Sequence, residues 1–233
     1  MNPTPLANPF APLREVARYS VRPRANRAFH TALDASELFT SKEPATVTWM
    51  REGGSGTLQV QMPVASGSFE ERCTFSLEPE LRPGSFERAL RGNERVLRHE
   101  HAEFAAIIPK LPPATYPETL LPFLLRGHPL DSARRSMHAW ICDRFVAKVY
   151  YEVHKRRVEV RVPAGSFVTT EVIMYPDLND WVKLGSMLTK LVKPLLPKYQ
   201  MWFAERGAGP HELIRFEGSY GPPGAPEIVL ERV

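Results

Sequence analysis

The chain has 233 residues, of which 43% are hydrophobic and 24% are charged, proportions typical of a globular protein rather than a disordered or fibrous one. No run of about 18 apolar residues occurs, and five prolines among the first 25 residues leave no apolar stretch of the kind found in signal peptides. Two cysteines are too few for a disulfide framework. We therefore expect a cytoplasmic protein with no membrane span and no cofactor.

The positive charge is concentrated at the N-terminus. The formal net charge is +4 and the isoelectric point is about 9.1. Residues 1–27 carry five arginines against one glutamate, so residues 28–233 sum to zero. The sequence thus predicts a Pro-rich basic arm over residues 1–24, suited to an anionic partner or to solubilisation. Its candidate binding residues are Arg14, Arg18, Arg22 and Arg24.

In the first half of the chain, few helix breakers interrupt 25–39, which predicts a helix. Three strand-like runs follow at 45–50, 57–64 and 69–77, and a glycine-rich loop joins the first two. A helical stretch is then predicted from Pro83 to Ile108. These elements form a first unit, 25–115.

In the second half, apolar residues at helical spacing predict a helix over 132–142. Alternating residues predict strands at 145–153, 157–162 and 167–175. Asp177 is placed to cap a further helix, and short strands at 211–217 and 227–232 form a C-terminal hairpin. These elements form a second unit, 116–233.

The two halves share a sequence pattern. In each, an alternating strand leads into a proline and a small-residue turn ending Gly-Ser-Phe, at 58–69 and at 158–167. The pattern indicates an internal duplication offset by about 100 residues. The predicted fold is α+β: two similar units of helix, three-stranded antiparallel meander and helix, packed as one composite domain.

The most chemically suggestive segment is His99-Glu-His-Ala-Glu103. It resembles the metalloprotease helix motif H-E-x-x-H with its last histidine replaced by glutamate. In that motif, residues at i and i+4 bind one zinc ion and the glutamate activates water. The resemblance implies His99 and Glu103 as metal ligands in a metal-dependent hydrolase.

Helix geometry favours other residues of this segment as members of a buried polar site. On a helix through Leu97, His99 and Glu103 would point away from the apolar face. Glu94, Glu100 and His101 would border it, either as a structural network or as the polar groups of a catalytic site.

A second basic patch follows the predicted strand 145–153. His154 and the run Lys155, Arg156 and Arg157 are predicted to form the tip of a hairpin that could meet phosphate groups. Histidines elsewhere lack ligand spacing, and no nucleophile motif appears.

Three functions remain open. The first is a non-catalytic adaptor or chaperone-like protein that binds another protein, by analogy with the compact units of bacterial secretion chaperones and immunity-type proteins. The second is the hydrolase described above. The third is nucleic-acid binding through the N-terminal arm and the 154–157 tip.

Overall fold

A computed structural model describes residues 2–11, 13–24, 42–64, 67–92, 95–107, 110–142, 145–177, 199–207, 209–220 and 227–233. These residues form one 13-stranded sheet with the order β6-β5-β4-β3-β2-β1-β13-β12-β11-β10-β9-β8-β7. All neighbouring strands are antiparallel except β7 and β8. The first six strands are β1 (Glu15–Pro23), β2 (Ala45–Glu52), β3 (Ser55–Val64), β4 (Gly67–Ser76), β5 (Arg82–Gly92) and β6 (Arg95–Glu103). The others are β7 (Thr115–Pro117), β8 (Arg135–Cys142), β9 (Phe145–Val162), β10 (Gly165–Pro176), β11 (Tyr199–Ala204), β12 (Glu212–Ser219) and β13 (Glu227–Arg232).

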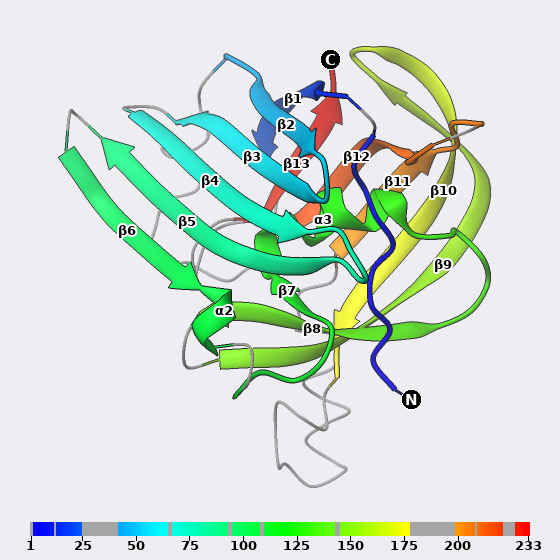
Figure 1. Cartoon of the computed structure of the whole chain (residues 1–233). Coiled ribbons are helices and arrows are strands. Elements are labelled where there is room, and N and C mark those ends of the chain that lie inside the picture. The colour runs from blue at the N-terminus through cyan, green and yellow to red at the C-terminus, as the bar shows by residue number, and fades with distance from the viewer. Residues whose placement is uncertain are drawn as a thin grey trace, which may run out of the picture.

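Helical structure within the described residues is confined to short turns. They are α2 (Phe104–Ile107), η2 (Glu118–Leu120), α3 (Leu121–Leu124) and η3 (Leu125–Gly127). The last three follow one another, and the sheet curls around them (Figure 1). We call residues 115–128 the inner segment.

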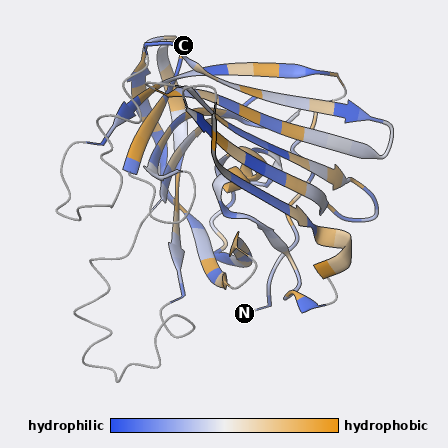
Figure 2. Cartoon of the chain, turned by 90° about the vertical axis from the view of Figure 1, so that its left-hand side faces the viewer, coloured by the Kyte–Doolittle hydropathy of each residue, from blue (hydrophilic) through white to orange (hydrophobic). Residues whose placement is uncertain are grey.

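Alternation of apolar and polar residues explains the strands. In β3, Leu58, Val60 and Met62 are fully buried while Gln59 and Gln61 are not, because successive side chains of a strand point to opposite faces. The same alternation gives neighbouring strands a banded appearance in Figure 2. The apolar face of the sheet turns inward and forms the core.

Aromatic side chains of the inner segment fill the space inside the curled sheet. Phe123 is fully buried, with its ring centroid 6.0 Å from that of Tyr19 and 6.1 Å from that of Trp49. Phe86 of β5 and Trp140 of β8 lie 5.2 Å apart by ring centroids, although their strands stand near opposite ends of the sheet order. The curl therefore brings both ends of the sheet onto one core.

The N-terminal segment packs over the inner segment. Leu6 and Phe10 are buried, and a Cβ added at Gly127 would lie 2.5 Å from the backbone oxygen of Asn8. A larger residue at Gly127 would displace this segment. β1 continues from the same region, so a strand at the centre of the sheet lies within residues 1–24, which were predicted as an arm.

The predicted α+β fold is wrong, because one sheet contains nearly every described element. The helix predicted over 83–108 is replaced by β5, β6 and the single turn α2, and the helix predicted over 132–142 is the strand β8. Internal duplication is not supported either, since the repeated sequence pattern marks two hairpins, β3–β4 and β9–β10, of the same sheet. The helices predicted at 25–39 and after Asp177 lie outside the described residues.

Most of the predicted strands are confirmed. The runs at 45–50, 57–64, 69–77 and 167–175 correspond to β2, β3, β4 and β10, and the two C-terminal strands correspond to β12 and β13. The runs at 145–153 and 157–162 are one strand, β9. Because β9 continues through residues 154–157, the prediction that they form a hairpin tip is wrong.

Candidate functional site

The strand β6 forms one edge of the sheet and contains the His99–Glu103 motif. Of the described strands it pairs with β5 alone, in a regular register from Ser85 opposite Glu103 to Leu90 opposite Arg98. On a strand, residues four apart are separated by about 13 Å, so His99 and Glu103 do not meet as they would on a helix. The premise of the zinc motif, an i and i+4 pair on one helix turn, is therefore wrong.

The exposed side chains of β6 pair with near neighbours instead. The imidazole of His99 lies 3.1 Å from a carboxylate oxygen of Glu87, and that of His101 lies 3.0 Å from Glu103. These four side chains are about half exposed. Within the described residues, no three His, Cys, Asp or Glu side chains form a group able to hold a metal ion. Glu94 lies outside the described residues.

The opposite face of β6 is anchored in the core. Ala102 is buried, and Glu100 accepts a hydrogen bond of 3.0 Å from Arg88 Nη1 on β5. Because one face is fixed, the free backbone edge of β6 is held in extended form. Glu100 and His101, which were predicted to act together at a seam, point to opposite faces of this strand.

Arg88 is the centre of a buried polar cluster that the sequence did not reveal. Its Nε donates to Glu71 Oε1 at 2.6 Å and its Nη2 to Thr119 Oγ1 at 3.0 Å. Thr119 and Tyr220 donate in turn to the two oxygens of Glu71, at 2.7 and 3.0 Å. Arg88 and Glu71 are 2% and 1% exposed, so this pair lies well away from bulk water.

The pKa values in this cluster follow from burial and charge. Burial alone would lower the pKa of Arg88, but the carboxylates of Glu71 and Glu100 raise it above its ordinary value. Burial, reinforced by the charge of Glu71, raises the pKa of Tyr220. The cluster thus fixes a permanent ion pair between β4 and β5 and ties it to the inner segment through Thr119. With every member hydrogen-bonded, its evident role is structural.

Glu118 is a neighbouring carboxyl group in a different environment. Burial raises its pKa, and the hydrogen bond from the Tyr199 hydroxyl only partly opposes this effect. Tyr199 on β11 itself has a raised pKa through burial and the nearby Glu118. This contact links the inner segment to β11, whereas the Arg88 cluster links the inner segment to β4 and β5.

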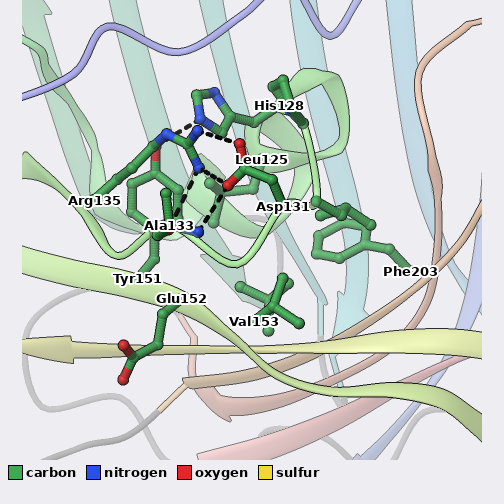
Figure 3. A pocket seen from close by; sticks show the side chains of 12 residues that line it. Leu125, His128, Asp131, Ala133, Arg135, Tyr151, Glu152, Val153 and Phe203 are labelled. Carbon is green, nitrogen blue, oxygen red and sulfur yellow. Dashed lines mark hydrogen bonds and ion pairs between the residues drawn. The ribbon is translucent and has the colours of Figure 1, made fainter.

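A small pocket lies beside His128 (Figure 3). His128 Nε2 is 3.1 Å from the Tyr151 hydroxyl, and Arg135 forms a close ion pair with Asp131 at the rim. The cavity volume is about 10 Å³, which admits at most one water molecule. No serine, cysteine or lysine nucleophile lines it. The pocket is too small for a substrate.

Protonation of His128 is expected to destabilise the fold. Burial lowers its pKa from 6.5 to about 4, and the charge of Arg135 adds to the effect. Because the folded pKa is the lower one, this contribution to stability is complete above about pH 6.5 and is lost as the pH falls to about 4. The free energy of unfolding should fall by about 3 kcal/mol over that range from this group. Urea titrations of wild type and His128→Gln at several pH values check this, and equal slopes in both proteins would contradict it.

A larger groove of about 210 Å³ lies between the β4–β5 connection and the start of the inner segment. Prolines and backbone form much of its lining, at Pro5, Pro83, Pro112 and Pro113. Its charged residues, Glu80 and Arg82, pair with each other at 3.4 Å. The groove holds no acid–base or nucleophilic set.

The predicted basic residues are not brought together. Lys155 stands in the same row of the sheet as Ser20, through Glu171, Trp202, Arg215 and Glu231. Five strand spacings of about 4.8 Å separate Lys155 from Ser20, so these two residues lie about 24 Å apart along the sheet. Arg22 and Arg24 moreover pair with Glu231 and Glu227. Arg14 and Arg18 are exposed on and beside β1.

No protein-family model, curated protein sequence or solved structure matches the chain. Among the residues the structure describes, no helix is long and apolar enough to cross a membrane. Any functional assignment must therefore come from the geometry of the chain itself.

Proposed function

We propose that the protein is a non-catalytic binding protein that adds an extended segment of another protein to the open edge of β6. The observation that carries this proposal is that, among the residues the structure describes, β6 pairs with a strand on one side only. An unpaired strand edge offers alternating N–H and C=O groups to a partner strand.

The other free edges of the sheet are less suitable. β7 has three residues. In the described part of the chain, the distal part of β9 pairs only with β10, but a register shift near Arg157, whose φ is 54°, bends it away. Bulges of this kind prevent pairing with another strand. β6 is regular over 98–103 and anchored from within.

The side chains of β6 allow pairing to be selective. The charged or polar residues His99, His101 and Glu103 discourage edge-to-edge aggregation, while their exposed faces can contact side chains of a bound strand. Among the described residues no catalytic set accompanies this edge, and the hydrolase hypothesis required a helix where the structure has the strand β6. Binding is the remaining function that β6 can perform.

Proline substitutions on β6 test this proposal. Neighbouring residues of a strand direct their backbone groups to opposite sides, so one of His101→Pro and Glu100→Pro removes an N–H that faces the open edge. The other removes an N–H that bonds to β5 and is expected to unfold the edge. Peptides selected from a random library on the wild-type protein should bind the folded proline variant about tenfold more weakly or worse.

Gln61→Ala, an exposed position on the inner strand β3, provides the control and should bind the selected peptides like wild type. Bound peptide should also slow hydrogen exchange at the amides of 98–103. Unchanged affinity in the proline variant that remains folded would refute binding at this edge.

A further inference from the structure

The strands β11 and β12 bury apolar side chains on both of their faces. Met201 and Phe203 of β11 belong to the main core, whereas Trp202 between them points to the outer face, because successive side chains of a strand alternate. Trp202 is nevertheless only 9% exposed, and Ile214 of β12, which belongs to the same outer cluster, is fully buried. Part of the described chain therefore covers the outer face at this point.

The covering element is the far end of the hairpin formed by β9 and β10. Val158, Val160 and Val162 alternate along β9 and so share one face of the hairpin, and Phe167 of β10 stands opposite Val160 in the register. These four side chains pack with Trp202, Ala204 and Ile214 in a cluster separate from the main core. We call residues 158–168 the flap.

The backbone shows the path of the flap across the sheet. The N–H of Ala164, at the tip of the flap, donates a hydrogen bond of 3.0 Å to the backbone oxygen of Arg232 on β13. In the sheet order β13 lies three strands from β10, about 14 Å away. The flap therefore crosses the outer face of β11 and β12, and its tip lies beside the C-terminus (Figure 1).

A bend in β9 and β10 allows the flap to fold back in this way. Arg157 has a φ of 54°, and the register between the two strands shifts on both sides of Glu171. Bulges of this kind interrupt the ladder of hydrogen bonds and bend the strand. Next to the bend, Arg156 donates a hydrogen bond of 2.6 Å to the backbone oxygen of Leu130. The base of the flap is thus fixed to the body of the protein, and its tip is held separately at β13.

We propose that the flap opens as a unit about this bend and uncovers the apolar outer face around Trp202 and Ile214. The main core does not include the side chains of the flap, so the sheet keeps its own packing when the flap lifts. Opening breaks the tip hydrogen bond and the small outer cluster alone, and regions with few buried apolar contacts open locally at a lower free energy than the whole fold. The open state presents a second apolar surface that the closed state hides. This inference does not depend on β6.

Thiol labelling with N-ethylmaleimide tests the proposal. Val162→Cys places a thiol on the covered face of the flap, and Cys142→Ser removes the partly exposed natural cysteine. Cys73, which is fully buried in the main core, remains as the internal reference for global unfolding. We expect the thiol at position 162 to be labelled about 100-fold faster than Cys73 or more, because local opening requires less free energy than global unfolding.

Two further variants bracket this result. Arg161→Cys lies on the exposed face of the same strand and should be labelled about tenfold faster than the thiol at 162 or more, because it needs no opening. Val60→Ala weakens the main core in the closed and open states alike. It should accelerate labelling of Cys73 about fivefold or more and leave the rate at 162 unchanged.

The opposite outcomes would overturn the proposal. Equal labelling at 161 and 162 would mean that the flap is not closed over the outer face. Equal labelling at 162 and Cys73, or equal acceleration of both by Val60→Ala, would mean that the flap opens only when the whole sheet unfolds. Hydrogen exchange of the wild-type chain excludes an effect of the cysteine itself, since amides of the flap should exchange faster than those of β3. A single rate for both segments would also contradict the proposal.

Discussion

Replacing Arg88 with methionine is expected to lower the free energy of unfolding by about 3–5 kcal/mol, because the substitution leaves the carboxylate of Glu71 buried without its counter-charge. Glu71 is 1% exposed and receives the 2.6 Å hydrogen bond from Arg88 Nε. Thr119 and Tyr220 would still donate to it, but neither carries a positive charge. Urea unfolding followed by tryptophan fluorescence measures the loss.

Two comparisons separate the buried charge from other causes. Arg22→Met breaks an exposed pair with Glu231 and should cost less than about 1 kcal/mol. Adding Glu71→Met to Arg88→Met removes the stranded charge and should recover part of the lost stability. A cost below about 1 kcal/mol for Arg88→Met alone would mean that the ion pair is not buried as described.

Phe123→Ala should be about as destabilising, at about 3–5 kcal/mol, because it leaves a cavity where the inner segment meets the sheet. Phe123 is fully buried, with the ring centroids of Tyr19, Trp49 and Tyr220 within 6.2 Å of its own. These partners come from β1, β2 and the residue after β12, so one side chain connects distant parts of the sheet. Thermal or urea unfolding gives the difference in stability.

Leu13→Ala is the control for this substitution, because Leu13 is 79% exposed and its truncation should change stability by less than about 0.5 kcal/mol. If Phe123→Ala cost no more than Leu13→Ala, the inner segment would not be part of the core that stabilises the sheet.

The strands that sequence could predict are those with a simple apolar alternation. In β3 and β4, apolar residues occupy most inward positions, and both strands were recognised. In β13 the apolar run Ile228–Leu230 is bounded by a glutamate on each side, which also suffices. Composition likewise led correctly to the expectation of no membrane-spanning helix, which holds for the described residues.

Two of the strands that the sequence did not predict, β5 and β6, carry charged residues at inward positions. Arg88 in β5 and Glu100 in β6 occupy inward positions opposite each other in the register. In a single sequence these charges break the period of two, and the remaining apolar residues, including Phe86 and Leu90, then fit a helical period instead. The buried ion pairs that stabilise this edge are therefore what concealed its strands.

The candidate site was only partly accessible from sequence for the same reason. The 99–103 segment was singled out, and it does lie at a distinctive place, the sheet edge. Its chemistry was misassigned because residue spacing has a different meaning on a strand than on a helix. The basic residues 155–157 were predicted as a hairpin tip, and only the register of β9 with β10 shows that they lie at a bend within one long strand.

The pairing of β1 with β13 has a consequence for how the chain folds. Arg22 and Glu231, which meet across these strands, are 209 residues apart in sequence. At about 5–20 residues per second, a ribosome needs roughly 10–40 s to make that stretch. Until β13 emerges, β1 and β12 each lack one of the two strands with which they pair in the sheet. We expect slow folding of high contact order, and a nascent chain that depends on protection of its unpaired strands from association during synthesis.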